Sequence, residues 1–169
     1  MMKRNDSLKK IAELLTGAKT VLLLTHMIPD GDTLGSAVAL CRALRNQGKT
    51  AHILAGESLP NQLSFLNGDC FIEERELLSE YDLAVAVDCS DPGRLSGREV
   101  HLSRAAATVS VDHHKTNTCF ADYNYVNPQA AAVGEIVYEL LTEAGIAVSK
   151  EVAEGIYVAI VTDTGQFQY

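Results

Sequence analysis

The sequence predicts an α/β domain in which helices cover both faces of a mainly parallel sheet. Short apolar runs recur along the chain, and such runs are typical of strands buried on both faces. Segments with apolar residues at helical spacing alternate with these runs, and this alternation favours a parallel sheet. A length of 169 residues suits one ordinary domain, so we expect residues 1–169 to form a single unit.

The first four predicted elements alternate between helix and strand. Apolar residues at helical spacing over residues 8–16 predict a short amphipathic helix. The continuous apolar run at residues 20–25 is too short for a buried helix and predicts a central strand. Helical spacing returns over residues 34–47 and stops at Gly48, a common C-terminal signal, and residues 50–54 predict the next strand.

The remaining elements follow a less regular stretch that contains Pro60 and Gly68. Three further runs predict strands, and two helix-like segments separated by Gly145 complete the pattern. The predicted strands cover residues 83–87, 108–111 and 123–126, and the predicted helices cover residues 130–144 and 150–161. The first of these helices has an apolar face that favours core packing, with a homodimer interface as the alternative.

Composition narrows the classes of function. The chain has 14 Lys and Arg against 22 Asp and Glu, so it lacks the basic surface of proteins that grip long nucleic acids. A short or small anionic substrate remains open, because metal ions and a few local cationic groups can hold it. No stretch approaches the roughly 20 apolar residues of a membrane span. The four cysteines are scattered without a secretory leader, so we expect reduced thiols and a cytoplasmic protein.

Metal-binding residue types follow three of the predicted strands. Ligands gather at the carboxyl ends of parallel strands, so the residues just after each run are the ones that indicate function. These residues are His26, Asp30 and Asp32 after the first strand, Asp88 after the third, and Asp112, His113 and His114 after the fourth. Three strand ends that carry such groups at one edge of a sheet predict a functional site.

Each of these groups has a plainer interpretation when it is taken alone. Asp30 and Asp32 suit a turn, with Asp32 or Thr33 capping the next helix, and Asp88 suits a loop or a cap. A histidine pair is commonly a hydrogen-bonded pair. Together the plain interpretations fail, because so many carboxylates would repel one another without a multivalent cation between them.

The ligand types indicate which cation the site would hold. Several carboxylates with imidazoles and no thiolate favour Mn²⁺, followed by Mg²⁺, Fe²⁺ or Co²⁺, and exclude a cysteine-rich structural zinc site. More ligands are present than one ion needs, which indicates two ions. A carboxylate that bridges ions roughly 3.5–4 Å apart serves to activate water and steady the leaving oxygen in phosphoester hydrolysis.

Other chemistries fit the sequence less well. The glycine-rich phosphate loops G-x-G-x-x-G and G-x-x-x-x-G-K-[ST] are absent. Cys89, His52 and His101 do not align with a base and an orienting carboxylate, so we expect them to be structural or solvated. A nucleotide-binding α/β domain without metals stays open as an alternative.

Four segments together resemble the successive motifs of the DHH phosphoesterase superfamily, over nearly the whole chain. They are His26-x-x-x-Asp30-Gly31-Asp32-x-x-Gly35-Ser36, a lone Asp88 after an apolar strand, Val111-Asp112-His113-His114, and Thr162-Asp163-Thr164-Gly165-x-Phe167-x-Tyr169. The first and last forms are more similar to the nano-RNase branch than to RecJ exonucleases or family II pyrophosphatases.

The resemblance implies a role for each residue. One metal would be held by His26, Asp30 and Asp88, and the other by Asp32, Asp88, His113 and Asp163, with Asp88 as the bridge. His114 would contact the substrate phosphate or act in catalysis, and Asp112 would orient the metal-binding imidazole. Asp163 is indicated only by this resemblance, since a carboxylate in the last turn of a helix is otherwise ordinary.

The resemblance also implies a function. The chain would hydrolyse short oligoribonucleotides, as an exonuclease, or remove the 3′-phosphate of adenosine bisphosphate, with a water activated by two metal ions. Members of the branch carry a second, DHHA1-type substrate-binding domain, and its Gly-rich, His-containing motif is absent from residues 1–169. A pyrophosphatase, a cyclic-dinucleotide phosphodiesterase and a non-catalytic nucleotide-binding module remain as alternatives.

Overall fold

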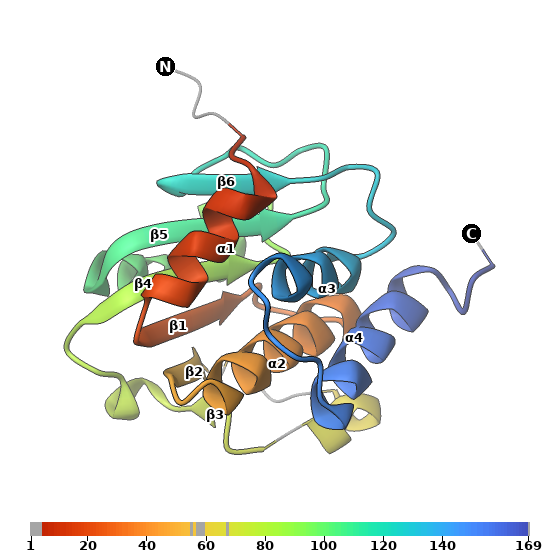
Figure 1. Cartoon of the computed structure of the whole chain (residues 1–169), viewed down its shortest axis with the longest axis horizontal. Helices are drawn as coiled ribbons and strands as arrows, with labels where there is room; N and C mark the ends of the chain where they lie inside the picture. Colours follow the sequence, from red (N-terminus) through yellow and green to blue (C-terminus); the bar gives the residue numbers. More distant parts are fainter. Residues whose placement is uncertain (1–4, 55, 57–59, 67, 169) are drawn as a thin grey trace.

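The structure is a computed structural model that describes residues 5–168 apart from 55, 57–59 and 67. Its centre is a parallel six-stranded sheet in the order β3-β2-β1-β4-β5-β6 (Figure 1). The strands are β1 (Thr20–Thr25), β2 (Thr50–Leu54), β3 (Phe71–Ile72), β4 (Tyr81–Val87), β5 (Ala105–Asp112) and β6 (Tyr123–Val126). The α-helices are α1 (Leu8–Gly17), α2 (Gly31–Asn46), α3 (Val133–Glu143) and α4 (Lys150–Asp163), and the 3₁₀ helices are η1 (Asn61–Leu66), η2 (Glu74–Glu76), η3 (Pro92–Leu95) and η4 (Arg98–Arg104). The predicted α/β class with a parallel sheet is confirmed.

Most predicted elements are present, and some have shifted ends. The strands at residues 20–25, 50–54 and 123–126 have the predicted bounds, whereas the two-residue strand β3 is too short to show a periodicity. Helix α2 begins at Gly31 and not at residue 34, because the Asp30 side chain accepts a hydrogen bond from the Thr33 amide at 3.0 Å. The plainer interpretation, in which Asp32 or Thr33 caps this helix, is therefore wrong, because the N-cap is Asp30.

The two faces of the sheet are covered by different kinds of segment. Alternate residues of β1 point to opposite faces, so Val21 and Leu23 join one buried cluster and Leu22 and Leu24 join the other. The first cluster includes residues from all four α-helices, which lie on one face of the sheet in Figure 1. The second cluster is closed by shorter segments, including η3 with its buried Leu95. Helical segments therefore cover both faces, but the α-helices share one of them.

Helices α2 and α4 cross at very short range. A Cβ atom on Gly35 would lie 2.8 Å from the Ala159 amide nitrogen and closer still to the Gly155 carbonyl oxygen. A Cβ atom on Gly155 would lie 2.7 Å from the Gly35 carbonyl oxygen. Only glycine at both positions lets the two backbones approach this closely. The same crossing puts the end of α4 beside the start of α2, where a Cβ atom on Gly31 would meet the Thr162 side chain.

The sheet has a topological switch point between β1 and β4. The chain passes from β1 outward to β2 and β3, then returns to β4 and continues outward on the other side to β6. The crevice at the carboxyl ends of two such neighbouring strands is where parallel sheets bind ligands. The residues that leave these ends begin with His26 after β1 and Asp88 after β4. The topology therefore brings two of the predicted metal-binding segments to the same crevice.

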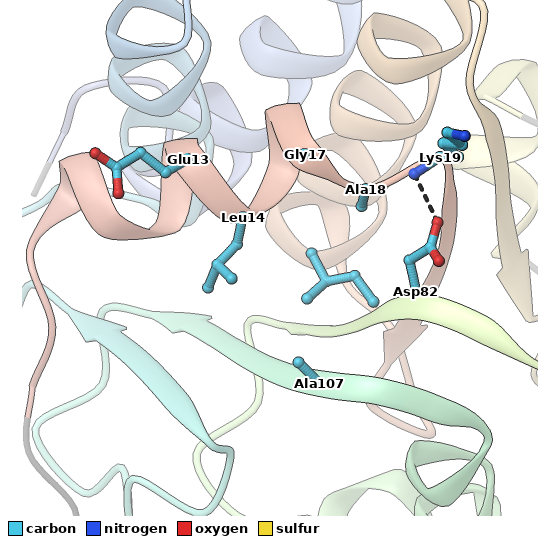
Figure 2. Close-up of a pocket in the computed structure, with 8 residues that line it drawn as sticks. Glu13, Leu14, Gly17, Ala18, Lys19, Asp82 and Ala107 are labelled. Carbon is cyan, nitrogen blue, oxygen red and sulfur yellow. Dashed lines mark hydrogen bonds between the residues drawn. The ribbon is translucent and has the colours of Figure 1, made fainter.

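A cavity of about 390 Å³ lies near the opposite end of the sheet, between α1 and the early residues of β4 and β5 (Figure 2). Its lining includes Lys19 and Asp82, and the Asp82 carboxylate accepts a hydrogen bond from the Lys19 amide at 2.7 Å. Within the described residues, no cluster of metal-binding side chains includes a residue of this lining. The cavity is therefore separate from the predicted site.

Helix α3 uses its apolar face for the core. Ile136, Val137 and Leu140 are fully buried, which supports the core-packing interpretation of this helix over a dimer interface. Across the part of the chain that the structure describes, none of the helices is both long enough and apolar enough to cross a membrane.

Candidate metal centre

The predicted ligands meet at the carboxyl edge of the sheet. Three groups of side chains have ligand atoms that all lie within 4.8 Å of one another. The groups are His26, Asp30 and Asp88; Asp88, His113 and His114; and Asp32, His113 and Asp163. Asp88 and His113 each belong to two groups, so the three groups form one continuous cluster. The cluster contains every predicted site residue except Asp112.

Asp88 lies in the middle of this cluster, and its two oxygens face different groups. Its Oδ2 lies 3.7 Å from His26 Nε2, whereas its Oδ1 lies 3.9 Å from His113 Nε2. The residue is buried, and its φ of 56° is in the left-handed region, which costs a non-glycine residue about 1–3 kcal/mol. The surroundings hold this conformation, since the Asp88 amide donates to the Val111 carbonyl oxygen at 2.9 Å.

His26 and Asp30 flank Asp88 on the β1 side. His26 is buried directly after β1, and its Nε2 lies 3.9 Å from Oδ2 of the exposed Asp30. Ligands that share one ion at about 2.0–2.2 Å lie within roughly 4 Å of one another. The separations among His26, Asp30 and Asp88 therefore match those of ligands around a single ion.

His113 has carboxylates on its other side. Its Nε2 lies 3.9 Å from Asp32 Oδ2 and 3.5 Å from Asp163 Oδ2. Its Nδ1 lies 3.1 Å from the Ala130 carbonyl oxygen, an arrangement that puts the ring proton on Nδ1 and the lone pair on Nε2. His113 is thus oriented with its acceptor nitrogen toward the carboxylates, as a metal ligand requires.

Asp32 also supports the start of α3. Its Oδ2 accepts a hydrogen bond from the Val133 amide at 2.7 Å, and its Oδ1 accepts one from the Gly134 amide at 3.0 Å. The N-cap residue of α3, Ala132, has no side-chain acceptor. Asp32, which belongs to α2, instead accepts the hydrogen bonds of the first amides of α3. The positive end of the helix dipole also favours a carboxylate at this place.

Asp163 is the last residue of α4, and its side chain is about one-third exposed. The chain then turns through three residues with positive φ, namely Gly165, Gln166 and Phe167. Phe167 is mostly exposed, and Tyr169, the final position of the fourth motif, lies outside the described residues. The motif thus contributes Asp163 to the cluster, and it does so from a helix end that no strand pattern indicates.

The charges of the centre are unbalanced without a cation. Burial and, after it, the neighbouring Asp32 charge raise the pKa of Asp88 to about 8. Burial also raises the pKa of Asp32 to about 6, although hydrogen bonds from α3 oppose the change. Asp88 Oδ1 is buried and has no hydrogen-bond partner among the residues that the structure describes. A divalent ion would stabilise both carboxylates and occupy the free oxygen, so the residues fit one.

In the metal-free protein, we expect the free energy of unfolding to fall as the pH rises from about 6.5 to about 8. The folded-state pKa of Asp88, about 8, exceeds the ordinary 3.8, so the folded protein binds more protons than the unfolded chain in this window. The free energy of unfolding would fall by at most about 1.4 kcal/mol per pH unit for each additional proton that the folded protein binds. Below pH 6.5, His26 has the opposite effect on the free energy of unfolding. Burial lowers its pKa, so in this range the folded protein binds fewer protons at His26 than the unfolded chain does.

Urea unfolding in the presence of EDTA measures this dependence. Saturating Mn²⁺ is expected to remove the decline, because an ion that binds the folded state favours the ionised carboxylates. A flat or rising profile in EDTA would contradict the assignment of Asp88 as a buried carboxyl that is costly to ionise.

His114 is held by Asp112 and not by a second imidazole. Asp112 is fully buried, and its Oδ1 lies 2.7 Å from His114 Nδ1 and accepts a hydrogen bond from the His113 amide at 2.8 Å. The hydrogen bond to Asp112 raises the pKa of His114 against the effect of burial. The expectation that Asp112 orients the metal-binding imidazole is wrong, because it orients His114, whereas the Ala130 carbonyl orients His113.

Thr33 belongs to the centre, although the sequence marks it only as a candidate helix cap. Its Oγ1 lies 2.6 Å from His26 Nε2, 3.1 Å from Asp30 Oδ1 and 2.5 Å from Asp88 Oδ2. The side chain is fully buried, and its single hydroxyl proton can serve only one carboxylate at a time. The available signal was its position three residues after the N-cap Asp30, which turns its side chain toward the cap.

The residues that the sequence excludes from the site lie outside the cluster. Cys89 is fully buried, and burial raises the pKa of its thiol to about 12, so it is not a nucleophile. His52 Nδ1 lies 3.0 Å from the Tyr81 hydroxyl, and His101 Nε2 lies 3.4 Å from Glu74 Oε1. Both histidines have structural contacts, as predicted. All four cysteines are free thiols.

Comparison with known proteins identifies relatives of the chain. Residues 20–160 match the family model described as the N-terminal domain of the DHH family. A protein from Thermus thermophilus named bifunctional oligoribonuclease and PAP phosphatase NrnA is 32% identical over 166 residues, which cover 97% of this chain and 49% of the relative. A protein from Geobacillus thermodenitrificans named cyclic-di-AMP phosphodiesterase GdpP is 29% identical, with 93% of this chain and 26% of the relative covered.

The fold is closely similar to that of a solved structure. The crystal structure of an exopolyphosphatase-related protein from Bacteroides fragilis has a TM-score of 0.87 and 25% identity, and the match covers 96% of this chain. It covers 51% of that protein, so the chain spans about half the length of both this structure and the Thermus relative.

Proposed function

Because this chain belongs to the DHH family, we propose that it hydrolyses phosphoesters at a centre that holds two divalent metal ions. One observation carries the proposal: the two oxygens of Asp88 face two groups of ligands, with His26 on one side and His113 on the other. A carboxylate between two ligand groups is placed to bind both ions of a two-metal hydrolase, one with each oxygen. The carboxylate and imidazole donors favour Mn²⁺, with Mg²⁺, Co²⁺ or Fe²⁺ as weaker candidates.

Different residues of the centre would bind the metal ions and the substrate phosphate. When bound, the ions would supply the positive charge that polarises a phosphoryl oxygen and lowers the pKa of a water. One ion would be held by His26, Asp30 and Asp88, and the other by Asp32, Asp88, His113 and Asp163. His114 Nδ1 is hydrogen-bonded to Asp112. When the ring is protonated, its other nitrogen, Nε2, can donate a hydrogen bond to the substrate phosphate.

We propose a short oligoribonucleotide or the 3′-phosphate of adenosine bisphosphate as the substrate. The name of the Thermus relative includes both an oligoribonuclease and a PAP phosphatase activity. The net charge of −8 supports a small substrate, because a long nucleic acid would need a basic surface. The match covers about half of that relative, so it supports the chemistry of the centre more directly than the choice of substrate.

The proposal predicts Mn²⁺-dependent release of mononucleotides from a dinucleotide. His113→Ala removes a ligand that two of the three groups share, and we expect it to lower kcat/KM by about 100-fold or more. Chromatography of the released nucleotides measures the rate, and elemental analysis of the purified protein measures the metal, with two ions per chain expected.

His52→Ala is the matched control for this experiment. His52 is also a partly buried histidine, with its Nδ1 3.0 Å from the Tyr81 hydroxyl, but it lies outside the metal cluster. We expect this variant to keep both ions and the wild-type rate. Full activity in a variant that lacks both the Asp88 and His113 side chains would contradict the proposal. Absence of bound metal would favour a metal-free nucleotide-binding domain.

A cyclic dinucleotide is a second candidate substrate, favoured by the relative named cyclic-di-AMP phosphodiesterase GdpP, which covers 93% of this chain. The same centre would open the ring by hydrolysis of one phosphodiester bond. Parallel assays with a linear dinucleotide, adenosine 3′,5′-bisphosphate, a cyclic dinucleotide and pyrophosphate separate the candidates by their kcat/KM values. Nucleotide binding without turnover of any of the four would favour the non-catalytic module.

A further inference from the structure

Asn117 joins the two loops that carry Asp88 and His114. Its Nδ2 donates to Asp112 Oδ2 at 2.7 Å and lies 3.2 Å from the carbonyl oxygen of Cys89, the residue after Asp88. Its own amide donates to the His114 carbonyl oxygen at 3.1 Å. One half-buried side chain thus contacts the carboxylate that orients His114 and the backbone that follows Asp88.

Asn117 completes the hydrogen bonding of a fully buried carboxylate. Asp112 Oδ1 contacts the His113 amide, the His114 amide and His114 Nδ1, whereas Oδ2 accepts from Asn117. A carboxylate held at both oxygens cannot turn about its Cβ–Cγ bond, so Oδ1 stays directed at the His114 ring. Without Asn117, the buried Oδ2 would lose its amide donor, and the carboxylate could rotate to share the donors on the other side.

The direction of the Asp112 contact determines which nitrogen of His114 faces the substrate. An acceptor at Nδ1 keeps a proton there, and in the neutral ring Nε2 is then the nitrogen without one. The two ring nitrogens are not interchangeable in the site, because His114 Nδ1 also lies 3.4 Å from Asp88 Oδ1. A ring that turned or changed tautomer would present a different group to both Asp88 and the substrate.

The backbone on the Asp88 side needs support as well. Asp88 has a φ of 56°, and the Cys89 carbonyl lies directly after this strained residue. The hydrogen bond from the Asp88 amide to Val111 links the end of β4 to β5, and the Asn117 contact to the Cys89 carbonyl links it to the loop that follows β5. Asn117 is therefore placed to hold Asp88 and His114 in a fixed mutual position.

We propose that Asn117 is a positioning residue of the hydrolytic centre, whose amide fixes the Asp112 carboxylate so that His114 keeps its proton on Nδ1. For its effect on turnover, this inference rests on the proposed phosphoesterase function. Its effect on the tautomer of the His114 ring is independent of that function, because the tautomer can be observed in the protein without metal or substrate.

Asn117→Ala tests the inference by kinetics. We expect kcat for Mn²⁺-dependent dinucleotide hydrolysis to fall by about 10-fold, as is usual when a residue that orients a site residue is removed, with KM nearly unchanged. Asn117→Ser is a second variant, because its hydroxyl can still accept the Cys119 amide that Asn117 Oδ1 accepts at 2.7 Å. Serine is too short to reach Asp112, so we expect the same loss of kcat with less disturbance of the loop.

Asn124→Ala is the matched control. Asn124 is also an asparagine that accepts a backbone amide and donates to a backbone carbonyl, both of Ala121, but it does not touch Asp112. It is fully buried, so its removal is expected to lower stability in urea at least as much as Asn117→Ala does. The kcat of Asn124→Ala is expected to stay near the wild-type value.

The second readout is the ¹H–¹⁵N spectrum of the His114 ring in metal-free protein, recorded at a pH above which its ring signals no longer shift, so that the ring is neutral. We expect one tautomer, with the proton on Nδ1, in wild type and Asn124→Ala, and a mixture in Asn117→Ala and Asn117→Ser. An unchanged tautomer in both Asn117 variants overturns the inference. In a wild type that hydrolyses the dinucleotide, a kcat equal to that of Asn124→Ala also overturns it. An inactive wild type would contradict the proposed function instead, and the tautomer would then decide the inference by itself.

Discussion

Asp88→Asn is expected to abolish hydrolysis and, at the same time, to stabilise the metal-free protein. The substitution keeps the shape of the side chain but removes the charge between the two ligand groups, so kcat/KM should fall by about 1000-fold, or about 4 kcal/mol. In the metal-free protein the Asp88 charge is costly, because burial and Asp32 raise its pKa to about 8. The Asn variant should therefore gain stability over wild type as the pH rises from about 4 to about 8.

Urea unfolding in EDTA and dinucleotide hydrolysis with Mn²⁺ measure the two effects. Asp82→Asn is the matched control, because Asp82 lies on the same strand, β4, near its other end, and loses the same charge. Hydrogen bonds from the Thr20 and Lys19 amides lower the pKa of Asp82, so this variant should lose stability and keep its activity. A stable, active Asp88→Asn variant would show that Asp88 does not bridge two ions.

Gly35→Ala is expected to lower the free energy of unfolding by about 2–3 kcal/mol. The new Cβ atom would lie 2.8 Å from the Ala159 amide nitrogen and closer to the Gly155 carbonyl oxygen, and both are backbone atoms that no rotamer change can move. Helix α4 must therefore move away from α2. Because Asp163 ends α4 and lies 3.5 Å from His113, the shift should also weaken binding of the second metal ion.

Gly17→Ala is the control for this change, because a Cβ atom there would have no neighbour within 4 Å. Alanine also has the higher helix propensity at the end of α1, so the control should be neutral or stabilising by a few tenths of a kcal/mol. Urea unfolding and a Mn²⁺ titration by calorimetry measure both variants. An equal effect of the two substitutions would mean that the glycine contact does not set the distance between α2 and α4.

The course of the backbone was largely predictable from local pattern. The short segments at residues 20–25, 50–54 and 123–126 were predicted as strands with the observed bounds, because the strands of a buried parallel sheet are short and rich in apolar or β-branched residues. The residue types after these runs also determined which side chains gather. His26, Asp88 and His113 meet because parallel strands end at a common edge.

The strand pattern of the sequence did not indicate Asp163, which only the resemblance to the fourth motif marked. Asp163 follows no strand, and only the close crossing of α2 and α4 at Gly35 and Gly155 brings it within 3.5 Å of His113. Asp32 was predictable as a member of the site, but its hydrogen bonds to the first amides of α3 were not. Both depend on where a helix lies relative to another, and apolar periodicity does not report that distance.

The hydrogen-bond partners were decided by the tertiary structure alone. Asp112 orients His114 and not His113, while Thr33 and Asn117 enter the centre as contacts that no motif marks. Sequence spacing tells which edge or face a side chain occupies, to within a few ångströms. A hydrogen bond needs a separation near 3 Å with the correct direction. That accuracy comes from loop conformations such as the φ of 56° at Asp88, which residues distant in the sequence hold in place.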